Sequence, residues 1–168
     1  DAFEIVLCLD PLPALVHGAD FLTPIVGQIV GRGHEVQLHI HTEWLAFARF
    51  NPVGRLTGRN IGDFPLGAQK KLIGLAADML VRAGAPDPVA FRAGNFGAND
   101  DTLRALAALG FAYDSSFNGA HIGHGCDIAL DRTNIGMRPP HGVCEVPVSG
   151  LMDRADSFRP AQLCAMSE

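Results

Sequence analysis

Short apolar segments separated by turns set the pattern along the chain. Residues 3–9, 35–41 and 89–92 are rich in β-branched or aromatic side chains and have the length of buried strands. Residues 144–148 have the same character. No apolar stretch approaches the length of a membrane span. The pattern therefore predicts a globular domain built on several short strands.

Longer segments with apolar residues at helical spacing lie between these strands. Residues 22–30 and 71–82 show this spacing, and glycines follow both as stop signals. A third helix is predicted to begin at Asn99 or Asp100, either of which can cap it, and to end near Gly110. Strands that alternate with helices indicate a mostly parallel sheet with outer helices. The expected fold class is α/β.

The region 117–142 shows no clear period and is rich in glycine, histidine, asparagine and proline. We expect an irregular loop, unless a strand lies near 128–130. Long ordered loops in compact domains tend to be functional. The HxxHxC sequence at His121, His124 and Cys126 suggests a second metal site, although such residues in a glycine-rich loop seldom converge without a scaffold.

Composition and charge limit the number of domains and the kinds of molecule that the protein is expected to bind. The chain has 168 residues, 48% of them apolar, which predicts a single domain over 1–168. A net charge of −5 with dispersed lysines and arginines argues against nucleic acid or a membrane as partner. The four cysteines form no CxxC pair, and residues 1–20 lack the pattern of an export leader. The expected location is cytoplasmic.

Candidate catalytic side chains follow the ends of three predicted strands. Asp10 ends the first strand, His39 and His41 the second, and Arg92 the third, where parallel sheets usually carry their active sites. The two histidines share one strand face and can meet one metal ion. If the extended path continues to Glu43, two histidines and a carboxylate form a catalytic zinc set. The plainer interpretation is a pair of surface histidines.

Two stretches resemble motifs of the polysaccharide deacetylase (NodB-homology) family. Residues 33–43, GHEVQLHIHTE, resemble its GHE turn and HxxxH metal pair, with His39 as the first ligand and Glu43 in place of the second histidine. Residues 91–100, FRAGNFGAND, and 110–116, GFAYDSS, resemble its FR-x-G/P and G-x-x-YDSS segments. Their order and spacing along the chain also agree with the family.

The resemblance implies a distorted or incomplete (β/α) barrel and a role for several residues. Either Glu43 or His41 would join His39 in holding one divalent metal, with Zn²⁺ expected and Co²⁺, Ni²⁺ or Mn²⁺ as suitable substitutes. Asp10 would be catalytic, and Arg92 would support the catalytic carboxylate by charge-assisted hydrogen bonds. The residues implied to line the substrate groove are Asn95, Phe96 and Pro147.

The sequence also departs from the family. Its first motif usually has two acidic residues, whereas Pro11 follows Asp10. The stretch from Asp10 to Gly33 is too short for the expected elements, which suggests that a segment near 10–20 is lacking. In that alternative Asp10 belongs to the end of the second strand and not to the metal site. The family's late strand with its catalytic histidine is not visible before the C-terminal end.

The function implied by the resemblance is that of a metal-dependent hydrolase that removes N-acetyl or related acyl groups from a carbohydrate. Such an enzyme acts on carbon–nitrogen bonds other than peptide bonds. One alternative is a metal-dependent amidohydrolase with a small amide substrate on the same scaffold. A second is a non-catalytic glycan-binding module, which the departures favour. A third is an α/β domain of unrelated function.

Overall fold

The fold centres on a five-stranded parallel sheet. The computed structural model describes residues 5–130, 141–154 and 157–160. All five strands run parallel, and they lie side by side in their sequence order. They are Val6–Leu9 (β1), Glu35–Ile40 (β2), Ala90–Ala93 (β3), Tyr113–Asp114 (β4) and Cys144–Glu145 (β5). An antiparallel pair, Gly150–Arg154 (β6) and Ser157–Pro160 (β7), forms a separate sheet.

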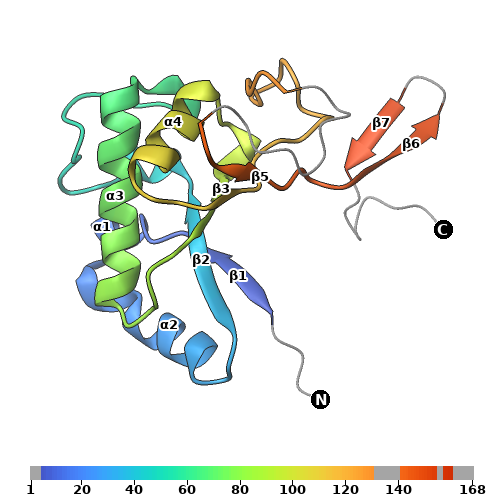
Figure 1. Ribbon diagram of the computed structural model, residues 1–168. Coiled ribbons are helices and arrows are strands. Elements are labelled where there is room, and N and C mark those ends of the chain that lie inside the picture. Colours follow the sequence, from blue (N-terminus) through green and yellow to red (C-terminus); the bar gives the residue numbers. More distant parts are fainter. Residues whose placement is uncertain (1–4, 131–140, 155–156, 161–168) are drawn as a thin grey trace.

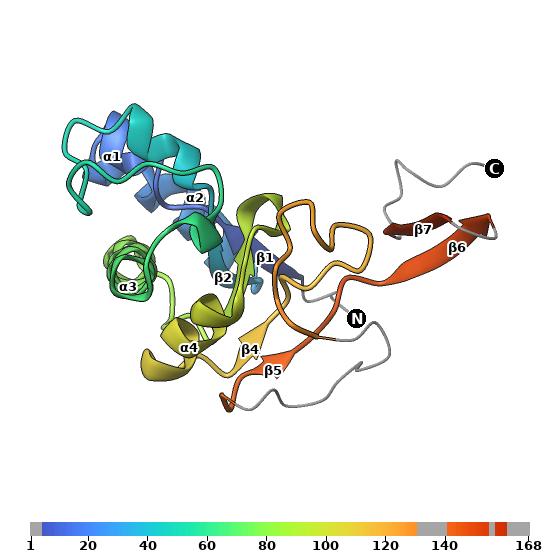
Figure 2. The same cartoon turned by 90° about the horizontal axis from the view of Figure 1, so that it is seen from above.

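Helices cover one side of the parallel sheet. They are Ala14–His17 (α1), Thr23–Val30 (α2), Leu66–Arg82 (α3) and Asp100–Ala108 (α4). Figures 1 and 2 show all four on the same side of the sheet, while the hairpin of β6 and β7 projects away from it. The core therefore lies between the helices and one face of the sheet.

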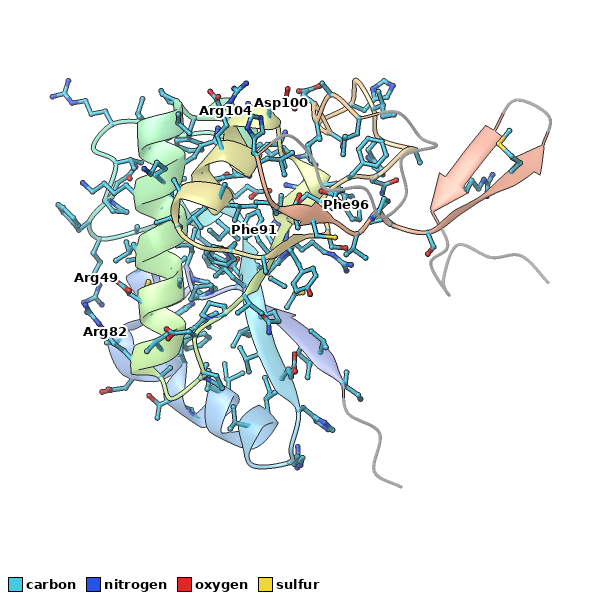
Figure 3. All side chains as sticks on the ribbon, in the orientation of Figure 1. Arg49, Arg82, Phe91, Phe96, Asp100 and Arg104 are labelled. Atoms are coloured by element: carbon cyan, nitrogen blue, oxygen red, sulfur yellow. The ribbon has the colours of Figure 1, made fainter. Side chains whose placement is uncertain are left out.

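The alternation of side chains along β2 explains how the sheet divides core from open face. Alternate side chains of β2 point toward the helices and are at most 2% exposed: Val36, Leu38 and Ile40. Leu38 is in register with Phe91 on β3 (Figure 3). Phe91 is also buried, and its ring contacts that of Phe111 edge to face. The β2 side chains that alternate with these, including His39, point to the opposite face of the sheet.

The strand order constrains the architecture. In a doubly wound sheet the order reverses at a switch point, which puts helices on both faces. Here each strand adds to the same edge, and the helices stay on one face, as they do around a (β/α) barrel. The α/β class with a parallel sheet and outer helices is confirmed, and a barrel stays a prediction that this strand order fits.

The observed elements differ from the predicted ones mainly in length. α3 begins at Leu66, ahead of the predicted start at residue 71, and Pro65 precedes it as the N-cap residue. β5 ends at Glu145, short of residue 148. Residues 128–130 form no strand, so that alternative is wrong. Residues 160–168 also have the sequence pattern of the start of a helix, but residues 161–168 lie outside the described ones.

Three further elements had no sequence prediction: the single turn of α1, the short strand β4, and the hairpin of β6 and β7. Short 3₁₀ turns also occur, at Ala19–Phe21, Thr42–Ala46, Ile61–Asp63 and Gly94–Phe96. None of the helices in the described ranges combines the length and apolar character needed to cross a bilayer.

Candidate functional site

Asp10 lies at the carboxyl end of β1, beside the end of β2. Its Oδ2 accepts a hydrogen bond from the backbone N–H of His41 at 3.0 Å, and its Oδ1 accepts one from Leu12 at the same distance. Burial raises the pKa of Asp10 to about 6, although both backbone donors act in the opposite direction. The carboxylate is thus held in place by backbone and binds protons more strongly than an exposed aspartate.

His39 lies at the end of β2 with its ring anchored to the next strand. Its Nδ1 is 2.7 Å from the carbonyl oxygen of Arg92, so this geometry assigns the ring hydrogen to Nδ1. Burial lowers the pKa of His39, which favours the neutral ring. A neutral imidazole that donates from one nitrogen to a carbonyl and keeps the other free is the usual arrangement of a metal-binding histidine.

His41 and Glu43 lie next to His39. The rings of His39 and His41 are 4.8 Å apart between centroids and nearly perpendicular, and His41 Nδ1 is 3.5 Å from Glu43 Oε2. The extended strand does not continue to Glu43, as one prediction required, because the chain enters the 3₁₀ turn Thr42–Ala46. The turn nevertheless brings the carboxylate to the histidine pair.

Asn95 fixes the carboxylate of Glu43 from the opposite side. Its Nδ2 donates to Glu43 Oε1 at 2.6 Å. Burial alone would raise the pKa of Glu43, but the hydrogen bond from Asn95 and the proximity of His41 outweigh it and lower that pKa. Asn95 and Phe96 both have positive φ, at 55° and 56°, a conformation that costs free energy in non-glycine residues.

Two glycines allow the turn that carries Asn95 to approach its neighbours. A Cβ at Gly94 would meet the carbonyl of Ile40 and the ring of His41, and a Cβ at Gly97 would clash with the side chain of Asn60. The glycine-rich character of this turn, visible in the sequence, is therefore needed for close packing against the end of β2.

The side chain of Arg92 hydrogen-bonds to a different residue from the expected one. Its Nε donates to the carbonyl of Ser115 at 3.2 Å and its Nη2 to Ser115 Oγ at 2.8 Å. Within the described residues it has no hydrogen bond to Asp10, whose oxygens already accept from backbone. Support of the catalytic carboxylate by Arg92 stays a prediction without a contact here. Pro147 lies two residues after the end of β5 and is half-buried.

The donor types of Asp10, His39, His41 and Glu43 suit a divalent metal. The anchored ring of His39 supports this interpretation. As they lie, however, no three His, Cys, Asp or Glu side chains of the described residues are grouped closely enough to hold one ion. Binding of a metal here would therefore require these side chains to rearrange.

The HxxHxC sequence does not converge. Cys126 is fully buried with its Sγ 3.9 Å from the carbonyl of Ser116, whereas the ring of His121 packs on Phe96. No arrangement of metal ligands is therefore built from these residues. Cys8, Cys126 and Cys144 are free thiols.

A buried pair of acids, Asp114 on β4 and Glu145 on β5, was not predicted. The two are in register and fully buried. Ser116 Oγ donates to Asp114 at 2.6 Å, and the N–H of Phe117 donates to Glu145 at 3.0 Å. Burial and the neighbouring Asp114 raise the pKa of Glu145 to about 11, and burial raises that of Asp114. A lone acid within the apolar stretch 144–148 was the available sequence signal.

A cavity of about 460 Å³ adjoins the site. Three loops contribute to it: residues 59–60, the turn after β3, and the loop that follows β4. Its lining residues are Arg59, Asn60, Asn95, Phe96, His121 and His124. The structure thus puts the predicted substrate residues Asn95 and Phe96 on a cavity wall.

Comparisons with known proteins give one similar solved structure and no match by sequence. The fold resembles the crystal structure of a Mycobacterium smegmatis protein provisionally assigned as a polysaccharide deacetylase, with a TM-score of 0.53 and 19% identity. The similarity covers 86% of this chain and 40% of that one. No family model and no curated protein matches. The structural similarity shows a shared fold. At 19% identity it does not show a shared reaction, which has to be argued from the residues of the site.

Proposed function

We propose that the chain carries the catalytic site of a metal-dependent hydrolase that removes N-acetyl or related acyl groups from a carbohydrate. The observation that carries the proposal is the gathering of Asp10, His39, His41 and Glu43 at the carboxyl ends of β1 and β2, with His39 anchored to the carbonyl of Arg92. The similar scaffold of the M. smegmatis protein supports it.

Each residue has a defined task in this proposal. His39 and His41, with Glu43, would hold the ion, and Asn95 would orient Glu43 through its 2.6 Å hydrogen bond. A bound divalent metal would polarise the acyl oxygen and lower the pKa of a water. Asp10 accepts a proton from the attacking water on either oxygen, since both are positioned by backbone N–H groups. The same carboxyl then returns that proton to the departing amine nitrogen.

The first test compares metal content and acetate release from N-acetylated chito-oligosaccharides in the wild type and four variants. We expect about one metal per chain in the wild type, and its loss in His39→Ala and Glu43→Ala, with activity reduced by about 100-fold or more. Asp10→Asn should keep the metal and lose activity, because the amide cannot take up the proton. His34→Ala, in the turn at the opposite end of β2, is the matched control and should keep both.

A wild-type chain that takes up no metal would contradict the hydrolase proposal. It would favour the non-catalytic glycan-binding module, for which the present side-chain arrangement, without three grouped ligands among the described residues, is the supporting observation. Release of acyl groups from small amides but not from oligosaccharides would favour the amidohydrolase instead.

A further inference from the structure

The cavity beside the candidate site has a wall suited to an anion. Arg59 supplies a guanidinium, which offers positive charge and several hydrogen-bond donors. His121 and His124 add ring nitrogens that can donate hydrogen bonds. Of the described residues that line the cavity, none is acidic. The wall therefore offers positive charge and donors without a competing carboxylate.

The cavity and the candidate catalytic group share one side chain. Asn95 lines the cavity, and its Nδ2 donates both to Glu43 at 2.6 Å and, more weakly, to the backbone oxygen of Arg59 at 3.5 Å. A substrate whose acyl group lies at Asp10 and His39 would therefore have a neighbouring part of the same molecule near Arg59.

Two aromatic rings and a side-chain amide give the cavity features of a binding site for a hydroxylated ring. Asn60 contributes the amide to the lining, and an amide can exchange hydrogen bonds with ligand hydroxyls. The rings of Phe96 and His121 lie 5.4 Å apart and form an apolar wall. Phe96 is held there by a backbone conformation with positive φ, in a half-exposed position.

We propose that this cavity is a subsite for a carboxylate-bearing sugar unit, so that the preferred substrate of the hydrolase is an acidic glycan. Arg59 pairs with the carboxylate, the amide of Asn60 hydrogen-bonds to a ring hydroxyl, and Phe96 packs against the sugar face. The link to catalysis rests on the proposed function, whereas the binding of the sugar depends on the cavity alone.

The test is an NMR titration of the protein without added metal, with D-glucuronate and D-glucuronamide as probes. The two sugars have nearly the same shape and differ in charge. We expect glucuronate to bind more tightly and to shift the imidazole signals of His121. Arg59→Gln should weaken glucuronate by about three- to tenfold and leave glucuronamide unchanged. Arg49→Gln, at an exposed arginine on the helix side of the molecule (Figure 3), should change neither.

Equal binding of the two sugars, binding of neither, or an Arg59→Gln variant that binds glucuronate as the wild type does would each overturn the subsite. Inorganic phosphate is a third probe. If phosphate binds with the same dependence on Arg59 and glucuronate does not bind, the cavity holds a free anion and the proposal is wrong. Because this titration needs neither metal nor turnover, its outcome is separate from that of the metal and acetate measurements.

Discussion

Asn95 combines an unfavourable backbone conformation with a hydrogen bond that the candidate site needs. Its φ of 55° lies in the left-handed region, which costs non-glycine residues about 1–2 kcal/mol, and Phe96 repeats it. Asparagine tolerates this region better than most residues. Such conformations persist where the surroundings impose them, and here they place one amide on Glu43 and one ring on the cavity wall.

Replacing Asn95 by glycine or by alanine separates these two effects. Both variants lose the donor to Glu43, so the pKa of Glu43 should rise in the metal-free protein, as measured by NMR of its carboxyl carbon. Only alanine keeps a Cβ in the left-handed region, so Asn95→Ala should be less stable than Asn95→Gly by about 1 kcal/mol in urea unfolding. Equal stabilities, or an unchanged pKa of Glu43, would show that our account of this turn is wrong.

At the residue scale the sequence predicts positions better than partners. Strand alternation correctly puts His39 on the face opposite Leu38, and the ends of parallel strands do bring Asp10 to His41. The partner of Arg92 was not predictable, because a long side chain at a strand end reaches several acceptors and the sequence does not fix its rotamer. In the structure the acceptor is Ser115, on the segment that follows β4.

At the scale of elements, β4 and β5 depend on a buried acid pair. Each strand has two residues, so their backbone ladder is short. Asp114 and Glu145 lie in register across this ladder, and each carboxyl also accepts a hydrogen bond, from Ser116 and from the N–H of Phe117 respectively. Two buried carboxyls side by side cannot both be charged at low cost, so they retain a proton at neutral pH.

This pair should make stability fall as the pH rises. Because the folded pKa of Glu145, about 11, lies above the ordinary 4.5, the folded state binds the proton more tightly than the unfolded chain. Its stabilising effect is complete below about pH 4.5 and is lost progressively above it, by at most about 1.4 kcal/mol per pH unit. Glu145→Gln, which keeps an acceptor for Phe117 and carries no proton to lose, should flatten the dependence between about pH 5 and about pH 9.

Urea unfolding at several pH values measures this slope. Glu35→Gln, at an exposed glutamate on β2, is the control and should leave the slope of the wild type unchanged. A Glu145→Gln variant that loses stability with rising pH as steeply as the wild type would contradict a shared buried proton.

Periodic elements were predicted from the sequence, and short ones were not. β2 and α3 have regular apolar positions, and their predicted and observed ranges largely agree. The loop after β4 has no period because it is held by single contacts, such as that between Cys126 and Ser116. β4 has only two residues, too few for an alternating pattern to appear.

At the scale of the whole molecule, stability should be unevenly distributed. β2 lies between β1 and β3, and its core side chains are at most 2% exposed. α3 packs over it with fully buried Leu72 and Leu80. The hairpin of β6 and β7 pairs only with itself among the described strands, and an isolated hairpin is marginally stable.

Native-state hydrogen exchange tests this distribution. We expect the amides of β2 to exchange slowest, close to the rate set by global unfolding, because they are hydrogen-bonded on both sides within the core. Amides of β6 and β7 should exchange faster by at least about 100-fold. Protection of the hairpin equal to that of β2 would indicate that it is stabilised by contacts beyond its own pairing.

The sequential strand order has a consequence for how such a sheet can change over evolution. In the parallel sheet, strands that are neighbours in space are also consecutive in the sequence, and no later strand of the described residues inserts between two earlier ones. A strand–helix unit can therefore be gained or lost at either edge while all remaining pairings are kept. The same order lets the sheet grow one strand at a time as the chain is synthesised, with each new strand meeting an edge that is already formed.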